Sequence, residues 1–236
     1  MPVMVIHLLK MVDIYNRQPV VQRRIGRIAA LAGLAVAVLV FLTPFALAWR
    51  LGAQAPDVTS VVANTPLGVK PGGALYLVPA SIKAADIAKV LRQGYDVELL
   101  NEGFRTLVKD LKLDILVIDT HPGLNEETLL SITISDVLLL ILRPDRQDFQ
   151  GTAVTVDVAR RLDVPNLYLV LNKVPSGVDL ADLRAQMDGA YGAETVAMLP
   201  LSEEVVQNAS GDLFSLTNPD LPWSAEIRKI ADSVRA

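Results

Sequence analysis

Cysteine is absent from the 236 residues, and histidine occurs only twice, at His7 and His121. The lack of cysteine excludes a disulfide framework, a thiolate zinc site and a thiol nucleophile, and two histidines are too few for a histidine-rich metal centre. The absence of cysteine also agrees with a reducing cytoplasm. Aromatic residues make up 5% of the chain against 51% hydrophobic residues in total, so we expect a core of mainly aliphatic side chains.

Positive charge is not in excess either. The chain has 22 Lys and Arg residues against 26 Asp and Glu residues, for a net charge of -4, and the two signs are interspersed along the sequence. Such a pattern gives no basic face and therefore no specific signal for nucleic-acid binding. A chain of this length can bury a sizeable core, and we expect one main domain.

The first fifty residues are unusual because residues 28–49 form a run without a single charge. As a helix this run would be about 33 Å long, enough to cross a bilayer, and the basic residues before it would keep the N-terminus in the cytoplasm. The alternative is a short helix over Ile25–Ala32, a stop at Gly33 and a buried strand over Ala35–Val40. Periodicity cannot separate a membrane anchor from the helix and strand, so both remain open for residues 1–50.

Beyond Leu51, apolar patterns typical of strands alternate with patterns typical of amphipathic helices. This alternation predicts an α/β fold in which a parallel sheet is flanked by helices in three layers. The last helix carries both acidic and basic residues, so we expect it to pack on the sheet and not on a membrane surface. The predicted strands are 74–78, 115–119, 136–142, 167–171 and 196–199, and the predicted helices are 82–91, 97–111, 125–133, 152–162, 180–191, one that begins at 202, and 226–234.

The most informative strand is 115–119, which ends in Asp119 and is followed by Thr-His-Pro-Gly. Ligands of open α/β sheets bind at the carboxyl ends of parallel strands, and an aspartate placed there can hold Mg²⁺ through water beside the phosphates of a nucleotide. The alternative is a strand that simply ends in a turn-forming Asp-Thr pair.

Five segments together resemble the MinD/ParA family of P-loop ATPases: 73–81, 115–123, 136–144, 169–173 and 199–202. Each segment alone is weak evidence, but they occur in the family's order and spacing over residues 51–236. The resemblance implies a P-loop NTPase-like αβα fold, ATP and Mg²⁺ as ligands, and a cytoplasmic bacterial nucleotide switch that positions cargo or division machinery. It also implies a homodimer and a protein partner or cargo, which the sequence does not identify.

The resemblance assigns roles to individual residues. Asp119 corresponds to the Walker B aspartate, which acts on Mg²⁺ through water, and Asn172 corresponds to the asparagine that reads adenine. His121 is interpreted as a switch-loop residue and not as a general base, because nothing else resembles a Ser-His-Asp set. The second switch loop comprises Thr120, His121, Pro122 and Gly123, and the adenine side comprises Asn172, Lys173 and Pro200.

One family feature is absent, because no Gly-x-x-x-x-Gly-Lys-Ser/Thr motif occurs in the sequence. Gly68–Gly73 is no substitute, since Lys70 precedes a proline and the segment enters a strand. Without the glycine-rich loop and its lysine, phosphate binding loses its main electrostatic terms, so we expect defective ATP hydrolysis. Three interpretations follow: a non-catalytic interaction module, a displaced reading frame before residue 51 that replaced the N-terminal strand, P-loop and helix, or a variant tethered to a membrane through residues 28–49.

Overall fold

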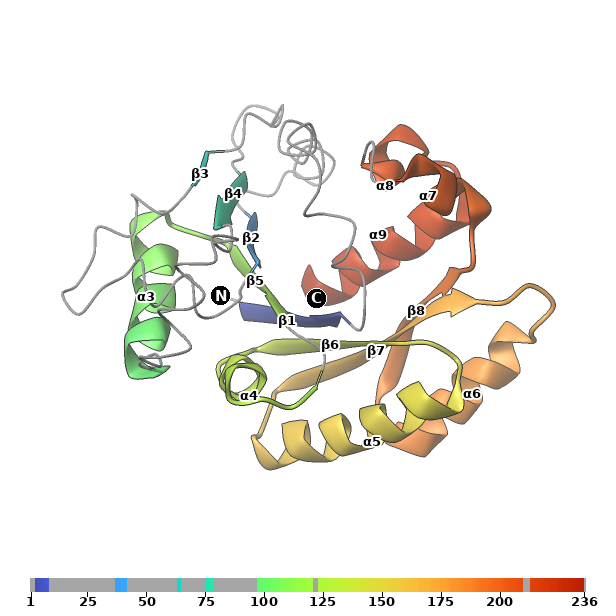
Figure 1. The fold of residues 1–236 in the computed structure, drawn as a ribbon, viewed down its shortest axis with the longest axis horizontal. Helices are drawn as coiled ribbons and strands as arrows, with labels where there is room; N and C mark the ends of the chain where they lie inside the picture. Colours follow the sequence, from blue (N-terminus) through green and yellow to red (C-terminus); the bar gives the residue numbers. More distant parts are fainter. Residues whose placement is uncertain are drawn as a thin grey trace.

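A computed structural model describes residues 3–8, 37–41, 63–64, 75–78, 97–120, 123–209 and 213–235. Its centre is an eight-stranded sheet with the order β3-β4-β2-β5-β1-β6-β7-β8 (Figure 1). The strand pairs are parallel except for β3 and β4, which are antiparallel. The strands are β1 (Val3–Leu8), β2 (Ala37–Phe41), β3 (Ala63–Asn64), β4 (Leu75–Val78), β5 (Ile115–Thr120), β6 (Val137–Leu142), β7 (Asn166–Val174) and β8 (Glu194–Pro200).

Helices cover both faces of this sheet. In Figure 1, α4, α5 and α6 lie on one side of the sheet and α7, α8 and α9 on the other. Together with the sheet they form the three layers that the sequence pattern predicts, so the predicted αβα fold is confirmed. The helices are α3 (Val97–Asp110), α4 (Glu126–Thr133), α5 (Arg146–Arg161), α6 (Leu180–Tyr191), α7 (Glu203–Asn208), α8 (Phe214–Thr217) and α9 (Pro222–Arg235).

The core is aliphatic, as the composition predicts. The larger cluster joins α3, α4, α5 and α6 to one face of the sheet and includes the fully buried Leu116, Leu138 and Leu169. On the other face, Val170 and Leu199 pack with Ile230 of α9. The central strands β5 and β6 contribute side chains to both faces, which explains why they read as continuous apolar runs and not as alternating ones.

The prediction of a transmembrane helix over residues 28–49 is wrong. Strand β2 occupies Ala37–Phe41 in the middle of this apolar run and pairs in parallel with β4 and β5. Strands that pair on both sides in a parallel sheet typically read as continuous apolar runs, so such a run without charges does not by itself indicate a membrane span. The alternative strand at 35–40 is confirmed, although it begins two residues later and ends one residue later, at Ala37–Phe41. The predicted helix at 25–32 lies outside the described residues. None of the helices that the structure describes is long and apolar enough to cross a membrane.

Strand β1 was not predicted from the sequence. It lies between β5 and β6 and pairs in parallel with both. Its six residues include His7, so they form only a short apolar run without a second signal such as an alternating pattern or a flanking turn. Through β1 and β2, the described segments 3–8 and 37–41 belong to the same sheet as the later strands.

Helix α5 begins at Arg146, six residues before the predicted start at 152. The carboxylate of Asp145 caps this end and accepts hydrogen bonds from the backbone N–H groups of Gln147 and Asp148. Val154, an apolar residue within the predicted helix 152–162, is 55% exposed and does not face the core. The buried face consists of smaller or polar residues that an apolar-stripe search overlooks: Asp148, Thr152, Thr155, Val156 and Ala159.

The last helix packs on the sheet, as predicted. The carboxylate of Glu226 accepts a hydrogen bond of 2.8 Å from the backbone N–H of Met198 in β8, and Val234 is buried. Strand β8 is the last strand of the sheet, so backbone N–H groups on its outer edge have no neighbouring strand to donate to. The Glu226 carboxylate supplies an acceptor for one of these groups, the N–H of Met198. The predicted helix over 82–91 lies outside the described residues.

Candidate functional site

Most of the predicted site residues that the structure describes lie at one edge of the sheet. Strands β5, β1, β6, β7 and β8 are parallel neighbours, so their carboxyl ends meet at this edge. Asp119 lies near the end of β5, while Asn172 and Pro200 lie near the ends of β7 and β8. Three strand spacings, about 14 Å, separate β5 from β7. A ligand that contacts both Asp119 and Asn172 must therefore extend across β1 and β6.

Asp119 is buried without full compensation. Its side chain is 6% exposed, and its Oδ1 atom has no hydrogen-bond partner among the residues that the structure describes. Burial disfavours the charged carboxylate and raises the pKa of Asp119 from 3.8 to about 7. The neighbouring strands contribute Ile6 and Phe41 at the same register. An uncompensated buried acid of this kind is costly, and it is typical of a functional position.

The Asp119 carboxylate fits Mg²⁺ as one oxygen donor. Mg²⁺ prefers oxygen ligands and is usually bound through one or two carboxylates, retained waters and substrate phosphates. Within the part of the chain that the structure describes, no group of three or more His, Cys, Asp or Glu side chains could hold a metal ion. Asp119 therefore fits a water-mediated contact to Mg²⁺ that a phosphate ligand brings with it, and not an all-protein metal cage.

Two of the four predicted switch residues are described. Thr120 is the last residue of β5, is buried, and pairs in register with His7 of β1. Gly123 is exposed and has a φ angle of +101°, which side-chain-bearing residues rarely adopt, so the chain turns sharply there. His121 and Pro122 lie outside the described residues, and the switch role of the whole segment stays a prediction.

The adenine-side residues Asn172, Lys173 and Pro200 are brought together by the pairing of β7 with β8. Val174 pairs with Pro200, and its carbonyl accepts a hydrogen bond of 2.8 Å from the N–H of Leu201. Asn172 is half-buried and Lys173 is exposed. A side-chain amide with one donor and one acceptor group at this edge has the chemistry needed to recognise a purine that carries an amino group.

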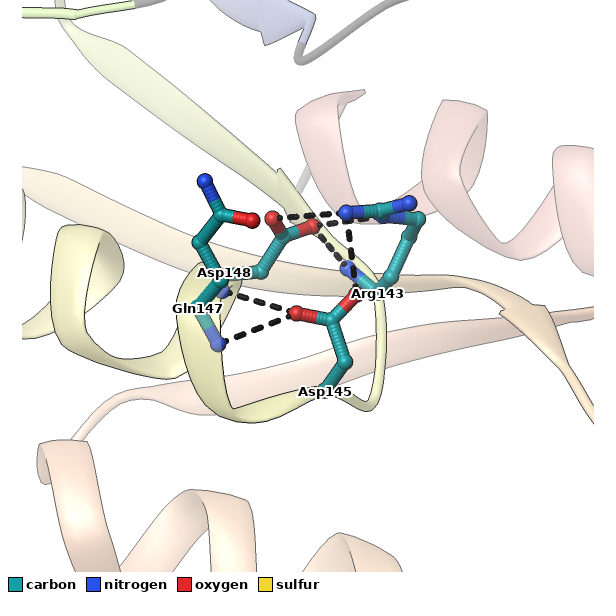
Figure 2. Close-up of polar contacts among 4 residues, drawn as sticks. All are labelled: Arg143, Asp145, Gln147 and Asp148. Carbon is teal, nitrogen blue, oxygen red and sulfur yellow. Dashed lines mark hydrogen bonds and ion pairs between the residues drawn. The ribbon is translucent and has the colours of Figure 1, made fainter.

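An ion-pair network beside these residues was not predicted from the sequence. Figure 2 shows Arg143, directly after β6, with its guanidinium group held by Asp148 and Asp145. Arg143 Nε and Nη2 donate to the Asp148 carboxylate over 3.0 and 3.2 Å, and the Arg143 backbone N–H donates to it over 2.9 Å. These contacts raise the pKa of Arg143 and fix the turn between β6 and α5. The signal in the sequence is the Asp145 cap, which places Asp148 in the first turn of the helix.

Comparison with solved structures identifies the fold. The chain is similar to the MinD cell division protein of Aquifex aeolicus, with a TM-score of 0.68 and 16% identity over 100% of this chain and 97% of that one. The MinD protein of Pyrococcus horikoshii OT3 complexed with Mg-ADP gives a TM-score of 0.68 and 16% identity over 99% of this chain and 95% of that one. The ParA family ATPase of Chlorobium tepidum TLS gives a TM-score of 0.66 and 13% identity over 98% of this chain and 98% of that one. The sequence matches no protein-family model and no curated protein. The chain thus has the P-loop NTPase-like fold of MinD and ParA proteins.

Proposed function

We propose that the protein is a MinD/ParA-like nucleotide-binding switch domain that acts in spatial positioning or partitioning. The observation that carries this proposal is Asp119, a buried carboxylate at the carboxyl end of a central parallel strand, one oxygen of which has no partner in the described part of the chain. Ligands of open α/β sheets bind at this edge. The similarity of fold to MinD and ParA ATPases supports the same assignment.

On the magnesium side, the Asp119 carboxylate would hold a water ligand of the Mg²⁺ ion. The buried negative charge of Asp119 would then be compensated by the positive charge of the ion. When bound, Mg²⁺ neutralises part of the charge of the phosphates. Binding of the ion would lower the cost of the ionised Asp119 carboxylate, because a nearby positive charge favours the charged form. The structure of Pyrococcus horikoshii MinD with Mg-ADP supports this pairing of nucleotide and ion on a similar fold.

On the base side, Asn172 would donate to and accept from an adenine edge, with Lys173 and Pro200 beside it. Asn172 is half-buried, so its amide can reach a ligand at the sheet edge while part of the side chain stays packed. Pairing of Val174 with Pro200 holds the ends of β7 and β8 together at this position.

We propose further that the protein does not hydrolyse ATP. The sequence contains no glycine-rich loop with a Gly-Lys-Ser/Thr ending, which in P-loop proteins supplies backbone N–H groups and a lysine to the phosphates. With Asp119 and Asn172 but without that loop, nucleotide binding would be weak and would depend on Mg²⁺ and the base.

Isothermal titration calorimetry on purified protein of verified mass tests the proposal. We expect ATP binding that is stronger with Mg²⁺ than with EDTA, and an Asp119→Asn variant in which the two conditions no longer differ. Asp114→Asn, at an exposed position directly before the same strand, is the matched control and should behave like the original protein. Absence of ATP binding under both conditions would contradict the proposal.

The missing motif favours one other function, a non-catalytic interaction module that uses the same fold without nucleotide. This alternative predicts no ATP binding with or without Mg²⁺, in contrast to the first proposal. Mg²⁺-dependent ATP turnover that Asp119→Ala abolishes would contradict both the alternative and the proposed lack of hydrolysis.

A further inference from the structure

Strand β7 contains a β-bulge at its carboxyl end, at Asn172 and Lys173. Leu171 pairs with Met198, and the next pair joins Val174 to Pro200. Between these two pairs the chain advances by three residues along β7 but by two residues along β8. Lys173 has a φ angle of +56°, in the left-handed region that residues with a side chain rarely adopt. One extra residue in one strand, with a left-handed residue beside it, is the geometry of a bulge.

The packing of the core shows the same extra residue independently. Leu169 and Leu171 belong to the cluster between the sheet and helices α5 and α6. In a regular strand, residues an odd number apart face opposite sides, so Val174 would face away from Leu171. Val174 is instead buried in the same cluster as Leu171. The bulge therefore inverts the alternation of the strand between these two residues.

This inversion matters for Asn172. In an uninterrupted strand, Asn172 would follow Tyr168 and Val170 on the sheet face that packs against α9, where the neighbours are apolar. A side-chain amide that is buried there without partners would be costly. At the bulge, Asn172 is half-buried and Lys173 is exposed, so the chain leaves the ladder while Val174 still anchors it in the core.

We propose that Lys173 is a positioning residue, whose left-handed backbone conformation orients the Asn172 amide toward a purine that carries an amino group. This inference rests on the proposed function, because it concerns how the base side of the same site is built. The Lys173 side chain is exposed, so the role belongs to its backbone conformation and not to its charge. Bulges commonly re-aim side chains next to binding sites.

The test compares residues that tolerate the left-handed region with residues that do not. Lys173→Gly and Lys173→Asn accept a positive φ angle, whereas the β-branched Lys173→Val resists it. Binding of adenosine and of inosine to the full chain is measured by NMR titration, with Asn172→Ala as the reference for loss of the amide. We expect Lys173→Gly and Lys173→Asn to keep the adenosine preference within about twofold, and Lys173→Val to reduce it by about fivefold or more.

The outcomes separate this inference from the proposed function. If the original protein does not distinguish adenosine from inosine, the base side of the proposed function fails. If it does, and Asn172→Ala loses the preference while a folded Lys173→Val keeps it, the positioning role is overturned. A loss in Lys173→Gly as large as in Asn172→Ala would also overturn it, because the side chain would then carry the effect. Lys173→Thr, which is β-branched but polar, replaces Lys173→Val if thermal denaturation shows that the latter is unfolded.

Discussion

Two aspartates at the carboxyl edge of the sheet are buried to the same extent but differ in their partners. Asp119 is 6% exposed and Asp148 is 7% exposed. The carboxylate of Asp148 accepts three hydrogen bonds from the backbone and guanidinium group of Arg143, whereas Oδ1 of Asp119 accepts none from any described residue. Burial alone therefore does not distinguish a structural from a functional carboxylate. The difference lies in whether the protein itself satisfies the charge.

Because of this difference, the two residues affect stability in opposite ways. The ionised Asp148 is part of an ion pair that fixes the turn between β6 and α5 (Figure 2). The ionised Asp119 is destabilising until a ligand compensates it, which is why its pKa is raised to about 7. Substitutions at the two positions therefore test whether the two carboxylates differ in this way.

The largest expected effect is a pH-dependent one at Asp119. Its pKa is 3.8 in the unfolded chain and about 7 in the folded protein, so the folded state binds more protons between these values and stability falls as pH rises through this window. Asn cannot ionise. We expect the free energy of unfolding of Asp119→Asn, relative to the original protein, to rise by about 2 to 3 kcal/mol between pH 5 and pH 8.

Urea denaturation in Mg²⁺-free buffer at the two pH values measures this effect. Asp114→Asn serves as the control, because Asp114 is an exposed carboxylate directly before the other end of the same strand, and this variant should not show the effect expected for Asp119→Asn. Equal stability differences at pH 5 and pH 8 for Asp119→Asn would mean that the Asp119 carboxylate is compensated, and the contrast with Asp148 would disappear.

The next effect in size is the loss of a compensated carboxylate. Asp148→Ala removes three hydrogen bonds and leaves the backbone N–H and the guanidinium group of Arg143 without their main acceptor. Since the Arg143 side chain is 39% exposed and keeps its contact with Asp145, water offsets part of the loss. We expect a decrease in the free energy of unfolding of about 2 kcal/mol.

A second ion pair in α5 provides a matched control for Asp148→Ala. Asp157 pairs with Arg161 at 3.0 Å, but both side chains are more than 60% exposed. We expect Asp157→Ala to change stability by less than about 0.5 kcal/mol, because exposed ion pairs contribute little. If the two substitutions cost the same, burial and backbone pairing of Asp148 would not matter, and its role in the turn would be disproved.

The contrast between Asp119 and Asp148 also explains what the sequence could predict. Asp119 ends a strand that is buried on both faces, so composition and order along the chain are enough to locate it. The contact between Asp148 and Arg143 depends on a turn and a helix start that the apolar pattern places six residues too late. The fold class and most strands after residue 51 follow from local periodicity.

Other features depend on long-range pairing and could not be predicted. Strand β1 is recognisable only because β5 and β6 lie on either side of it. Strand β2 has the composition of a membrane span, and only its pairing with β4 and β5 shows that it is a strand of the sheet. The bulge at Lys173 contains no glycine to signal a left-handed residue, so it becomes visible only through the register of β7 and β8.

The smallest expected effect extends the comparison to a neutral group. Thr195 in β8 is fully buried, and its Oγ1 atom has no hydrogen-bond partner within the described ranges, although its backbone N–H donates to the Asp188 carboxylate over 2.7 Å. Valine has nearly the same shape without the hydroxyl group. We expect Thr195→Val to raise the free energy of unfolding by about 1 kcal/mol, because the cost of burying an unpaired polar group is removed.

The matched substitution is Thr155→Val in α5, where the hydroxyl group is buried but donates to the carbonyl of Gly151 over 3.0 Å. Here the substitution removes a hydrogen bond, and we expect a loss of about 0.5 to 1 kcal/mol, measured in the same urea titrations. Opposite signs for the two threonines would extend the rule seen at Asp119 and Asp148 from charged to neutral groups. If the two substitutions changed the free energy of unfolding in the same direction, the rule would hold for charged groups alone. The cost of burying a hydroxyl group would then not depend on whether it has a hydrogen-bond partner.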